Sequence, residues 1–485
     1  MSPALLWFRR DLRLADNPAL QALIDAGHTP LPVYIHNEPD ADWITGAASN
    51  WWLHHSLVAL QQSLRQHGSD LLVFQGNPGG ILTRLLQKTG ADRLAWNRCY
   101  EAAGIKRDTQ LKQALEKLGC HVSSHNAALL REPWENLKDD GSPYRVFTPF
   151  WKKLQGIGPS REAIRAIETL PGFDPDPITD TVPIDSLKLL PDVKWDQAFY
   201  THWTPGEDGA WKALQHFTDQ NLLDYTAHRD RPALAGTSHL SPHLHFGEIS
   251  PLQIWKALSS HAATNTTRGI IPAAESYLRE IAWREFSYPL LYHYPATPLQ
   301  SRDKRFDAFP WKKHYKRDLQ RWQRGQTGIP LVDAGMRELW TTGYMHNRVR
   351  MIAASFLIKN LLIPWQEGAH WFWNTRVDAD LANNTMGWQW CAGCGADAAP
   401  YFRIFNPVLQ GQKFDQQGQY VRRWLPELAR LDNKYIHKPW TADPAVLADA
   451  GIILGKDYPE PLVDLQDSRR QALSAWNQVR QLQRN

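Results

Sequence analysis

The chain has 485 residues, 43% of them hydrophobic and 21% charged, a composition typical of a globular protein with a large buried core. Its 54 lysine and arginine residues against 50 aspartate and glutamate residues give a net charge of +4, which excludes a uniformly basic nucleic-acid binder but permits one local basic groove. Four cysteines exclude a disulfide-stapled scaffold and favour a reducing, cytoplasmic location.

The first part of the chain alternates short apolar runs with helical patterns. The apolar runs lie at 4–8, 31–35, 71–74 and 93–97, and a helical pattern covers 51–68. Strands separated by helices predict an α/β domain with a doubly wound parallel sheet, which we assign to residues 1–130. The first strand is not followed by GxGxxG, and GxxxxGK[ST] is absent from the chain, so a nicotinamide enzyme or a P-loop ATPase is disfavoured.

The pattern changes twice after residue 130. Residues 131–205 are rich in Pro, Asp and Gly and predict a linker, whereas residues 206–485 carry helical patterns almost throughout and predict an all-α domain that ends in a short helical tail. No segment reaches the roughly 20 apolar residues of a membrane helix, and the N-terminal apolar run contains charges, so neither an anchor nor a signal peptide is predicted.

One helical pattern combines aromatic, acidic and basic side chains. Tyr277, Glu280 and Arg284 share a face, with Trp283 beside them. This face suits a ligand, but an exposed ion pair between Glu280 and Arg284, worth about 0.2–0.5 kcal/mol, is the alternative.

A second helical pattern, at 345–362, has a core face opposite a polar one. The core face holds Val349, Ile352, Ala353, Phe356 and Leu357. Asn347 and Met351 lie opposite, flanked by Arg348, and suit a flat polar ligand, although an Asn near a helix start is often only a cap.

The segment 373–390 concentrates polar and aromatic residues. It contains Asp378, Asp380, Asn383, Asn384, Trp388 and Trp390. Acids and amides are costly in a core unless they bind something, and no His or Cys nearby completes a metal site, so no metal is predicted. A buried carboxylate needs a cation, and we expect Asp378 to pair with Arg350.

Two further motifs have a structural and a functional interpretation. Cys391 and Cys394 could form half a zinc site or a redox pair, but without a second CxxC we expect two ordinary buried thiols. Residues 236–241, GTSHLS, precede a helical pattern and predict a helix cap, a phosphate cradle, or both.

Tryptophan is unusually abundant, with 23 residues against 15 Tyr and 16 Phe. Indole rings fill cores, stack on flat ligands or carry electrons, and packing explains most of them.

Several motifs together resemble the DNA photolyase and cryptochrome family over essentially the whole chain. They are WFRRDLRLADNPAL at 7–20, GTSHLSPHLHFGEIS at 236–250 and DADLANNTMGWQWCAGCGADAAPYFRIFNPVLQGQKFD at 378–415. Within the family, WWLHHSL and YVRRWLPELARLDNKYIHKPW are most similar to the bacterial class III photolyases for cyclobutane pyrimidine dimers. The resemblance implies an antenna domain, a helical domain that holds a U-shaped FAD, and light-driven repair of these dimers in DNA by electron transfer from reduced FAD.

The resemblance also assigns the flavin contacts. They are Tyr225, Thr237, Ser238, Leu240, Ser241, Tyr277, Glu280, Arg284, Asn347, Arg350, Asp378, Asp380 and Asn384. Asn384 is expected to face the flavin N5, where plant cryptochromes carry Asp, and Tyr277 stands where relatives often have Trp.

By the same likeness, an electron relay runs through Trp388, Trp365 and Trp311, with Trp322 as a nearby alternative for the third member. The flipped-out lesion would meet Glu280, Trp283, Asn347, Arg348, Met351 and Trp390. Basic residues in 302–306, 311–317 and 410–414 would contact DNA phosphates.

Two functions remain as alternatives, a cryptochrome photoreceptor without repair and a (6-4) photolyase. Asn384, the retained Glu280 and the short tail favour repair, and (6-4) enzymes usually show paired histidines where this chain has only His346. We expect an antenna chromophore, with methenyltetrahydrofolate favoured over a deazaflavin and Glu101 as a weak folate contact. DNA is the expected partner of a monomeric, nucleoid-associated protein that needs no protein partner and no membrane.

Overall fold

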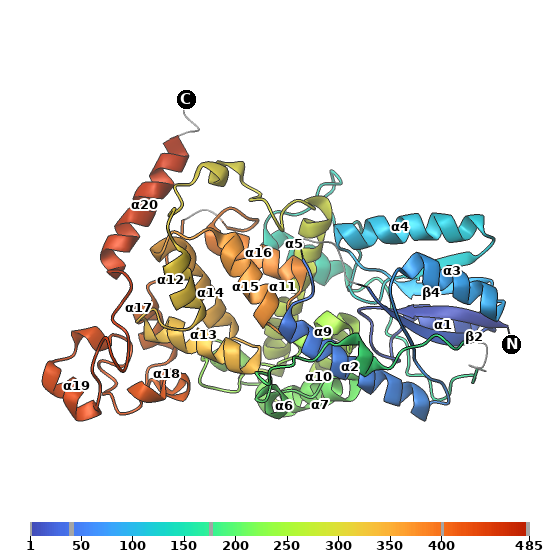
Figure 1. The fold of residues 1–485 in the computed structure, drawn as a ribbon, viewed down its shortest axis with the longest axis horizontal. Coiled ribbons are helices and arrows are strands. Elements are labelled where there is room, and N and C mark those ends of the chain that lie inside the picture. The colour runs from blue at the N-terminus through green and yellow to red at the C-terminus, as the bar shows by residue number, and fades with distance from the viewer. Residues whose placement is uncertain (1, 38–42, 174–177, 399–401, 482–485) are drawn as a thin grey trace. The chain divides into compact units, whose positions relative to one another are not determined.

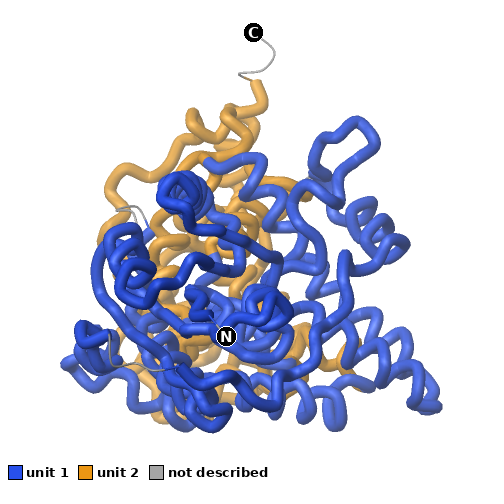
Figure 2. The backbone as a smooth tube through the Cα atoms, turned by 90° about the vertical axis from the view of Figure 1, so that its right-hand side faces the viewer, with its two compact units in different colours: residues 1–223, 238–295, 377–380 blue, residues 224–237, 296–376, 381–485 orange. Residues whose placement is uncertain are grey.

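The computed structural model describes residues 2–37, 43–173, 178–398 and 402–481. Contacts group the chain into two compact units (Figure 2). Unit 1 comprises Met1–Leu223, Ser238–Pro295 and Val377–Asp380, and unit 2 comprises Asp224–Thr237, Ala296–Arg376 and Leu381–Asn485. Unit 1 thus includes segments on both sides of residue 205. The division at residues 130 and 205 stays a prediction.

Unit 1 contains a five-stranded parallel sheet with the order β3-β2-β1-β4-β5. Its strands are β1 Pro3–Phe8, β2 Thr29–His36, β3 Leu72–Gln75, β4 Arg93–Asn97 and β5 His121–His125. Strands β2 and β4 of this sheet are labelled in Figure 1. The four predicted strands and the doubly wound class are confirmed. Strand β5, with the sequence HVSSH, was missed because this edge strand buries only Val122 fully and so lacks the continuous apolar run of a central strand.

Two prolines in β2 fit the sheet because of their register. The backbone N–H of Thr29 donates to the carbonyl of Ser2 beside β1, so the N–H groups of alternate residues point to the other side of the strand. Pro30 and Pro32 occupy those alternate positions, and β3 pairs with β2 only from Val33 onward. The missing N–H groups therefore fall where the strand has no partner on that side.

Four helices follow the strands, and local capping explains where two of them begin. They are α1 Pro18–Asp25, α2 Ala47–Gln66, α3 Pro78–Thr89 and α4 Ala102–Lys117. The side chain of Asn17 caps α1 and that of Asn77 caps α3, each before a proline at the first helical position.

Residues 131–205, the predicted linker, contain helices that the sequence analysis did not predict. Helix α5, Phe147–Ile157, buries Phe147, Phe150, Trp151 and Leu154, and α6 spans Phe199–His202. These four apolar residues recur at helical spacing, although the segment as a whole is rich in Pro, Asp and Gly.

From residue 206 on, the described chain forms helices, apart from one isolated bridge between Leu454 and Tyr458, as predicted. In unit 1 they are α7 Glu207–His216, α9 Ser241–Phe246, α10 Pro251–Thr264 and α11 Ile270–His293. In unit 2 they are α8 Tyr225–His228, α12 Lys316–Gln323, α13 Pro330–Thr342, α14 Asn347–Ser355, α15 Trp365–Thr375, α16 Leu381–Ala392, α17 Pro407–Phe414, α18 Gln419–Trp424, α19 Pro444–Ala450 and α20 Leu465–Gln481. Among the described helices, none is long and apolar enough to cross a membrane.

The helical pattern after GTSHLS is two helices, because Gly247 interrupts it. Gly247 has a φ of 69°, and a Cβ there would lie 2.1 Å from the carbonyl oxygen of Arg10. Only glycine permits this close approach and this backbone conformation. Helix α10 then begins with a capping box between Ser250 and Gln253.

Candidate functional site

In unit 1, the loop before α9 ties its hydroxyl groups to two predicted flavin residues. The hydroxyls of Ser238 and Tyr277 are 2.7 Å apart, and Ser241 Oγ donates to Asp378 Oδ2 at 2.7 Å. Between the serines, His239 has a φ of 54°, which is strained for a residue with a Cβ. The N-cap of α9 makes no side-chain hydrogen bond, so the prediction of a hydroxyl cap was wrong, while the phosphate cradle stays a prediction.

Arg284 in α11 is buried and fully engaged. Its Nη1 donates to the carbonyl of Ala128 at 2.8 Å and to Glu285 Oε1 at 3.2 Å, and its Nη2 donates to the Tyr288 hydroxyl at 3.3 Å. The ion pair of Arg284 is therefore with Glu285, and the alternative of an exposed pair with Glu280 was wrong. Glu280 is half-buried on the same helix.

The carboxylates of Asp378 and Asp380 are both buried in unit 1. The Tyr288 hydroxyl donates to Asp380 Oδ2 at 2.7 Å, and His245 Nδ1 lies 3.8 Å from the same oxygen. Burial by itself would raise the pKa of Asp380, but His245, Arg284 and Tyr288 together hold this pKa well below its usual range. These neighbours therefore favour the ionised form of Asp380.

Trp283, a predicted wall of the lesion pocket, is half-buried and lies parallel to Phe147 from α5, with ring centroids 3.7 Å apart and an interplanar angle of 7°. Phe147 therefore covers one face of the indole and fixes its plane. Sequence reasoning missed Phe147 because it lies in the segment taken as a linker; its place in the apolar stripe of 147–154 was the available signal.

In unit 2, α14 has the predicted two faces. Val349, Ile352 and Ala353 are buried, as are Phe356 and Leu357 in the π-helical turn that follows, Phe356–Asn360. Asn347 is exposed and Met351 half-buried. The cap of α14 is His346, whose Nδ1 accepts from the backbone N–H of Arg348 at 3.2 Å, so Asn347 is not the cap.

Two arginines flank that polar face. Arg348 pairs with Asp230 at 2.7 Å, and the guanidinium of Arg350 lies over the ring of Tyr344, 4.8 Å from its centroid. The expected pair of Arg350 with Asp378 stays a prediction.

Asn384 in α16 is 2% exposed, and only one of its two side-chain amide atoms has a hydrogen-bond partner among the described residues. Nδ2 donates to the carbonyl of Ala369 in α15 at 3.1 Å, whereas Oδ1 is buried with no hydrogen-bond partner among the described residues. A buried acceptor left unpaired is unfavourable by about 1–3 kcal/mol. An N–H donor of a bound group would satisfy it, so this residue fits the reduced flavin N5 that the resemblance assigns to it.

The predicted relay tryptophans lie in unit 2 at different depths. Trp388 and Trp365 are buried, and Trp311 is half-buried. Trp388 packs edge-on against Phe372, at 5.0 Å between centroids, and against Trp322, at 6.3 Å. Gly368, one turn after Trp365 in α15, faces the Trp388 indole so closely that a Cβ there would lie 2.0 Å from Cη2. The order of the relay stays a prediction.

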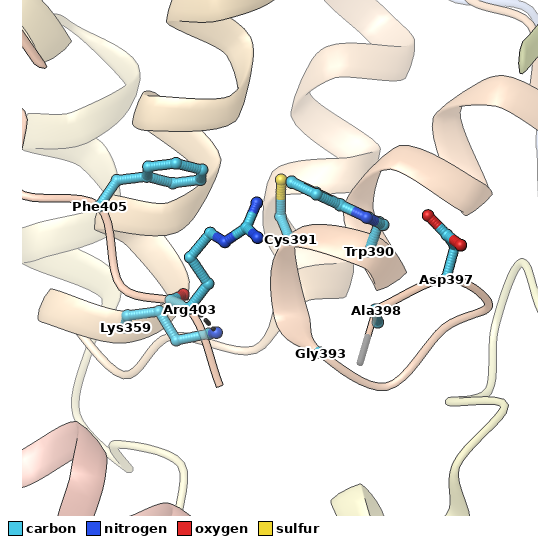
Figure 3. Close-up of a pocket in the computed structure, with 8 residues that line it drawn as sticks. All are labelled: Lys359, Trp390, Cys391, Gly393, Asp397, Ala398, Arg403 and Phe405. Atoms are coloured by element: carbon cyan, nitrogen blue, oxygen red, sulfur yellow. Dashed lines mark hydrogen bonds between the residues drawn. The ribbon is translucent and has the colours of Figure 1, made fainter. Parts of the chain in front are cut away.

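Trp390, the second predicted lesion wall, lines a small cavity of about 30 Å³ with Lys359, Cys391 and Arg403 among its neighbours (Figure 3). The Arg403 guanidinium lies 5.6 Å from the Trp390 ring centroid, and the ring of Phe405 lies 6.5 Å away. The buried Lys359 donates to the Arg403 carbonyl at 3.2 Å. Arg403 and Phe405 were not singled out from the sequence, although they belong to the motif at 378–415.

Two thiols lie in this region, those of Cys391 and Cys394. Cys391 and Cys394 are free and buried, and burial raises the pKa of each thiol to about 12. This confirms the interpretation as ordinary buried thiols. Among the described residues, no group of three or more His, Cys, Asp or Glu side chains is placed to hold a metal ion.

Some of the charged residues predicted to contact DNA or an antenna chromophore form ion pairs within the chain. In the predicted basic rim, Arg305 pairs with Asp303 and Lys312 with Asp318. Glu101, the candidate folate contact, pairs with Arg10 in unit 1 and is therefore not merely a solvated acid.

Comparisons with known proteins cover the whole chain. A family described as the DNA photolyase matches residues 4–168, and one described as the FAD binding domain of DNA photolyase matches residues 277–478. A deoxyribodipyrimidine photo-lyase of Agrobacterium fabrum is 47% identical over 99% of this chain and 98% of its own, and cryptochrome-2 of Arabidopsis thaliana is 38% identical over 99% and 79%. The crystal structure of a bacterial class III photolyase from Agrobacterium tumefaciens superposes with a TM-score of 0.94 at 45% identity, covering 99% of this chain and 98% of that one.

Proposed function

Because the chain belongs to the DNA photolyase and cryptochrome family, we propose that it is a deoxyribodipyrimidine photo-lyase that uses light to split cyclobutane pyrimidine dimers in DNA. Splitting this ring needs one electron delivered and then returned, which reduced FAD supplies in light when it is bound. The remaining tasks, which are extrusion of the lesion, its orientation and control of charge around it, fall to the side chains of this chain.

The observation that carries repair is the amide of Asn384. A neutral amide with an unpaired Oδ1 accepts a hydrogen bond but has no proton to give or take at ordinary pH, unlike an acid at the same place. Such a residue stabilises a reduced flavin without exchanging a proton with it. The alternative, a photoreceptor that signals without repair, is expected to benefit from a titratable group at this position.

The lesion pocket that the family resemblance implies would have aromatic walls and a carboxyl group. Trp283 and Trp390 would stack on the flipped pyrimidines, with Asn347, Arg348 and Met351 around them. The contact of Phe147 with Trp283 supports this role, since a wall with one face already packed presents the other in a fixed plane. Glu280 would hydrogen-bond the carbonyl edge where negative charge develops.

The relay would run from Trp388 through Trp365 to Trp311. Two observations support this order. Solvent exposure increases from the buried Trp388 and Trp365 to the half-buried Trp311, and α15 packs closely on α16 at Gly368. The contact of Trp388 with Phe372 and Trp322 offers a side branch.

For light harvesting we propose a second chromophore, methenyltetrahydrofolate in preference to a deazaflavin. The support is the resemblance alone, since Glu101 is already held by Arg10. Reconstitution with each pigment decides the matter: the one that binds should add an absorption band and raise the repair rate at that wavelength.

Repair is tested by illuminating the purified, FAD-loaded protein with dimer-containing DNA under reducing conditions. Thymine dimers should disappear in light and persist in darkness. Glu280→Ala should slow repair without releasing FAD, whereas Glu275→Ala, an exposed acid on the same helix, should leave the rate unchanged. Persistence of dimers in light while (6-4) lesions vanish would refute the substrate assignment, and persistence of both would favour the photoreceptor.

A further inference from the structure

Unit 1 holds a cavity of about 550 Å³ that belongs to none of the sites described above. Its walls come from α2, the segment 163–167, α7, α10 and the turn at Leu14 and Ala15. No residue predicted to bind flavin, lesion or relay electrons lines it. The volume lies within the range of sites for small molecules, about 300–1,000 Å³.

Three helices direct side chains one turn apart into this cavity. Helix α2 contributes Ser63, and His67 follows directly after its last residue; α7 contributes Glu207 and Trp211, and α10 contributes Gln253, Lys256, Ala257 and Ser260. Residues three and four apart share a helix face, so each helix presents a continuous strip to the same space.

Two basic and two acidic side chains line the cavity, so its formal charge is balanced. Arg165 and Lys256 line it, and neither forms an ion pair with any residue that the structure describes. Of the two acids, Glu207 is already satisfied, because its carboxylate accepts from the backbone N–H groups of Leu14 at 2.8 Å and Ala15 at 3.1 Å. Glu207 keeps its charge, but its carboxylate is directed at these N–H groups, so Arg165, Lys256 and Asp208 are the charged groups that a ligand would meet.

The other groups favour a flat ring that carries polar atoms. Trp211 is half-buried and has no aromatic ring packed on it among the described residues, so a face of its indole can receive a ligand. His67 Nδ1 lies 2.7 Å from the carbonyl of Ser63 and must donate to it, which makes Nε2 an acceptor in the neutral ring. The hydroxyls of Ser63 and Ser260 offer further hydrogen bonds.

We propose that this cavity binds a flat heteroaromatic carboxylate, stacked on Trp211, with its carboxylate toward Lys256 and Arg165. The site is separate from the dimer and flavin residues, so the proposal goes beyond the proposed function and does not depend on it.

The test uses kynurenate, a planar quinoline with one carboxylate, and 4-hydroxyquinoline, the same ring without it. Calorimetric titration of the full, FAD-loaded chain in the dark and without DNA should show one kynurenate site and much weaker binding of 4-hydroxyquinoline. Trp211→Leu and Lys256→Gln should each weaken kynurenate binding roughly three- to tenfold. Lys212→Gln, the next residue of α7 and not part of the cavity, is the matched control and should leave binding unchanged.

Three results would overturn the proposal: no saturable binding of kynurenate, equal binding of the two probes, or loss of flavin absorbance as kynurenate binds, which would place it in the flavin site. The assay involves neither light nor DNA. Failure of dimer repair therefore leaves this inference standing, and failure of kynurenate binding leaves the repair function standing.

Discussion

Replacing Gly368 with alanine tests the packing between α15 and the first predicted relay tryptophan. The new Cβ would lie 2.0 Å from Cη2 and 2.4 Å from Cζ3 of Trp388, whereas carbon atoms in contact are normally about 3.5–4.0 Å apart. The indole must therefore move, yet Phe372 and Trp322 pack against it and it is 3% exposed. Overpacking of this kind lowers stability by about 1–3 kcal/mol, only partly offset by the roughly 1 kcal/mol that alanine gains over glycine in a helix.

The displaced indole should also slow photoreduction of the flavin, because electron transfer depends on the distance between rings. The assay is the rise of reduced-flavin absorbance during illumination with an external reductant, together with urea unfolding. Gly387→Ala is the matched control, since it lies in α16 beside Trp388 and its Cβ would meet nothing within 4 Å. If Gly368→Ala keeps both the stability and the photoreduction rate of Gly387→Ala, the reasoning from packing is refuted.

Three further predictions concern the lesion wall, the flavin amide and a buried acid. Phe147→Leu should raise the KM for dimer-containing DNA several-fold with little change in kcat, because Trp283 loses the ring that stacks on it. Phe150→Leu is the control and should leave KM unchanged, because Phe150 packs on Phe286 and not on Trp283. Equal KM values for both variants would contradict the role of Trp283 as a wall of the lesion pocket. Asn384→Asp should slow repair and lower stability by about 1–3 kcal/mol, since a carboxylate replaces the donor to the Ala369 carbonyl; unchanged unfolding would show that this bond is not important. Burial raises the pKa of Glu285 to about 7, above its value in the unfolded chain. The contribution of Glu285 to the free energy of unfolding is therefore full below about pH 4.5 and is lost as the pH rises through 7. Urea unfolding at pH 5 and pH 8 should show that Glu285→Gln reduces this pH-dependent loss by about 1–3 kcal/mol, and an unchanged loss would exclude Glu285 as its cause.

The sequence by itself determined the class of the protein and most of its elements. Apolar runs and helical periodicity are local signals, so the strands β1 to β4 and the two faces of α14 could be predicted. The candidate site residues could also be predicted, because the motifs that carry the family resemblance are read directly from the sequence.

Only the tertiary structure decided which side chains meet. Arg284 pairs with Glu285 and the Ala128 carbonyl and not with Glu280 one turn away, Phe147 stacks on Trp283, and Gly247 divides a helical pattern because Arg10 passes against it. Each of these contacts joins groups whose approach depends on how whole helices pack, and packing is set by shape and burial over the entire core. A pattern along the chain records which face of a helix is buried, but the partner that covers it comes from a distant segment.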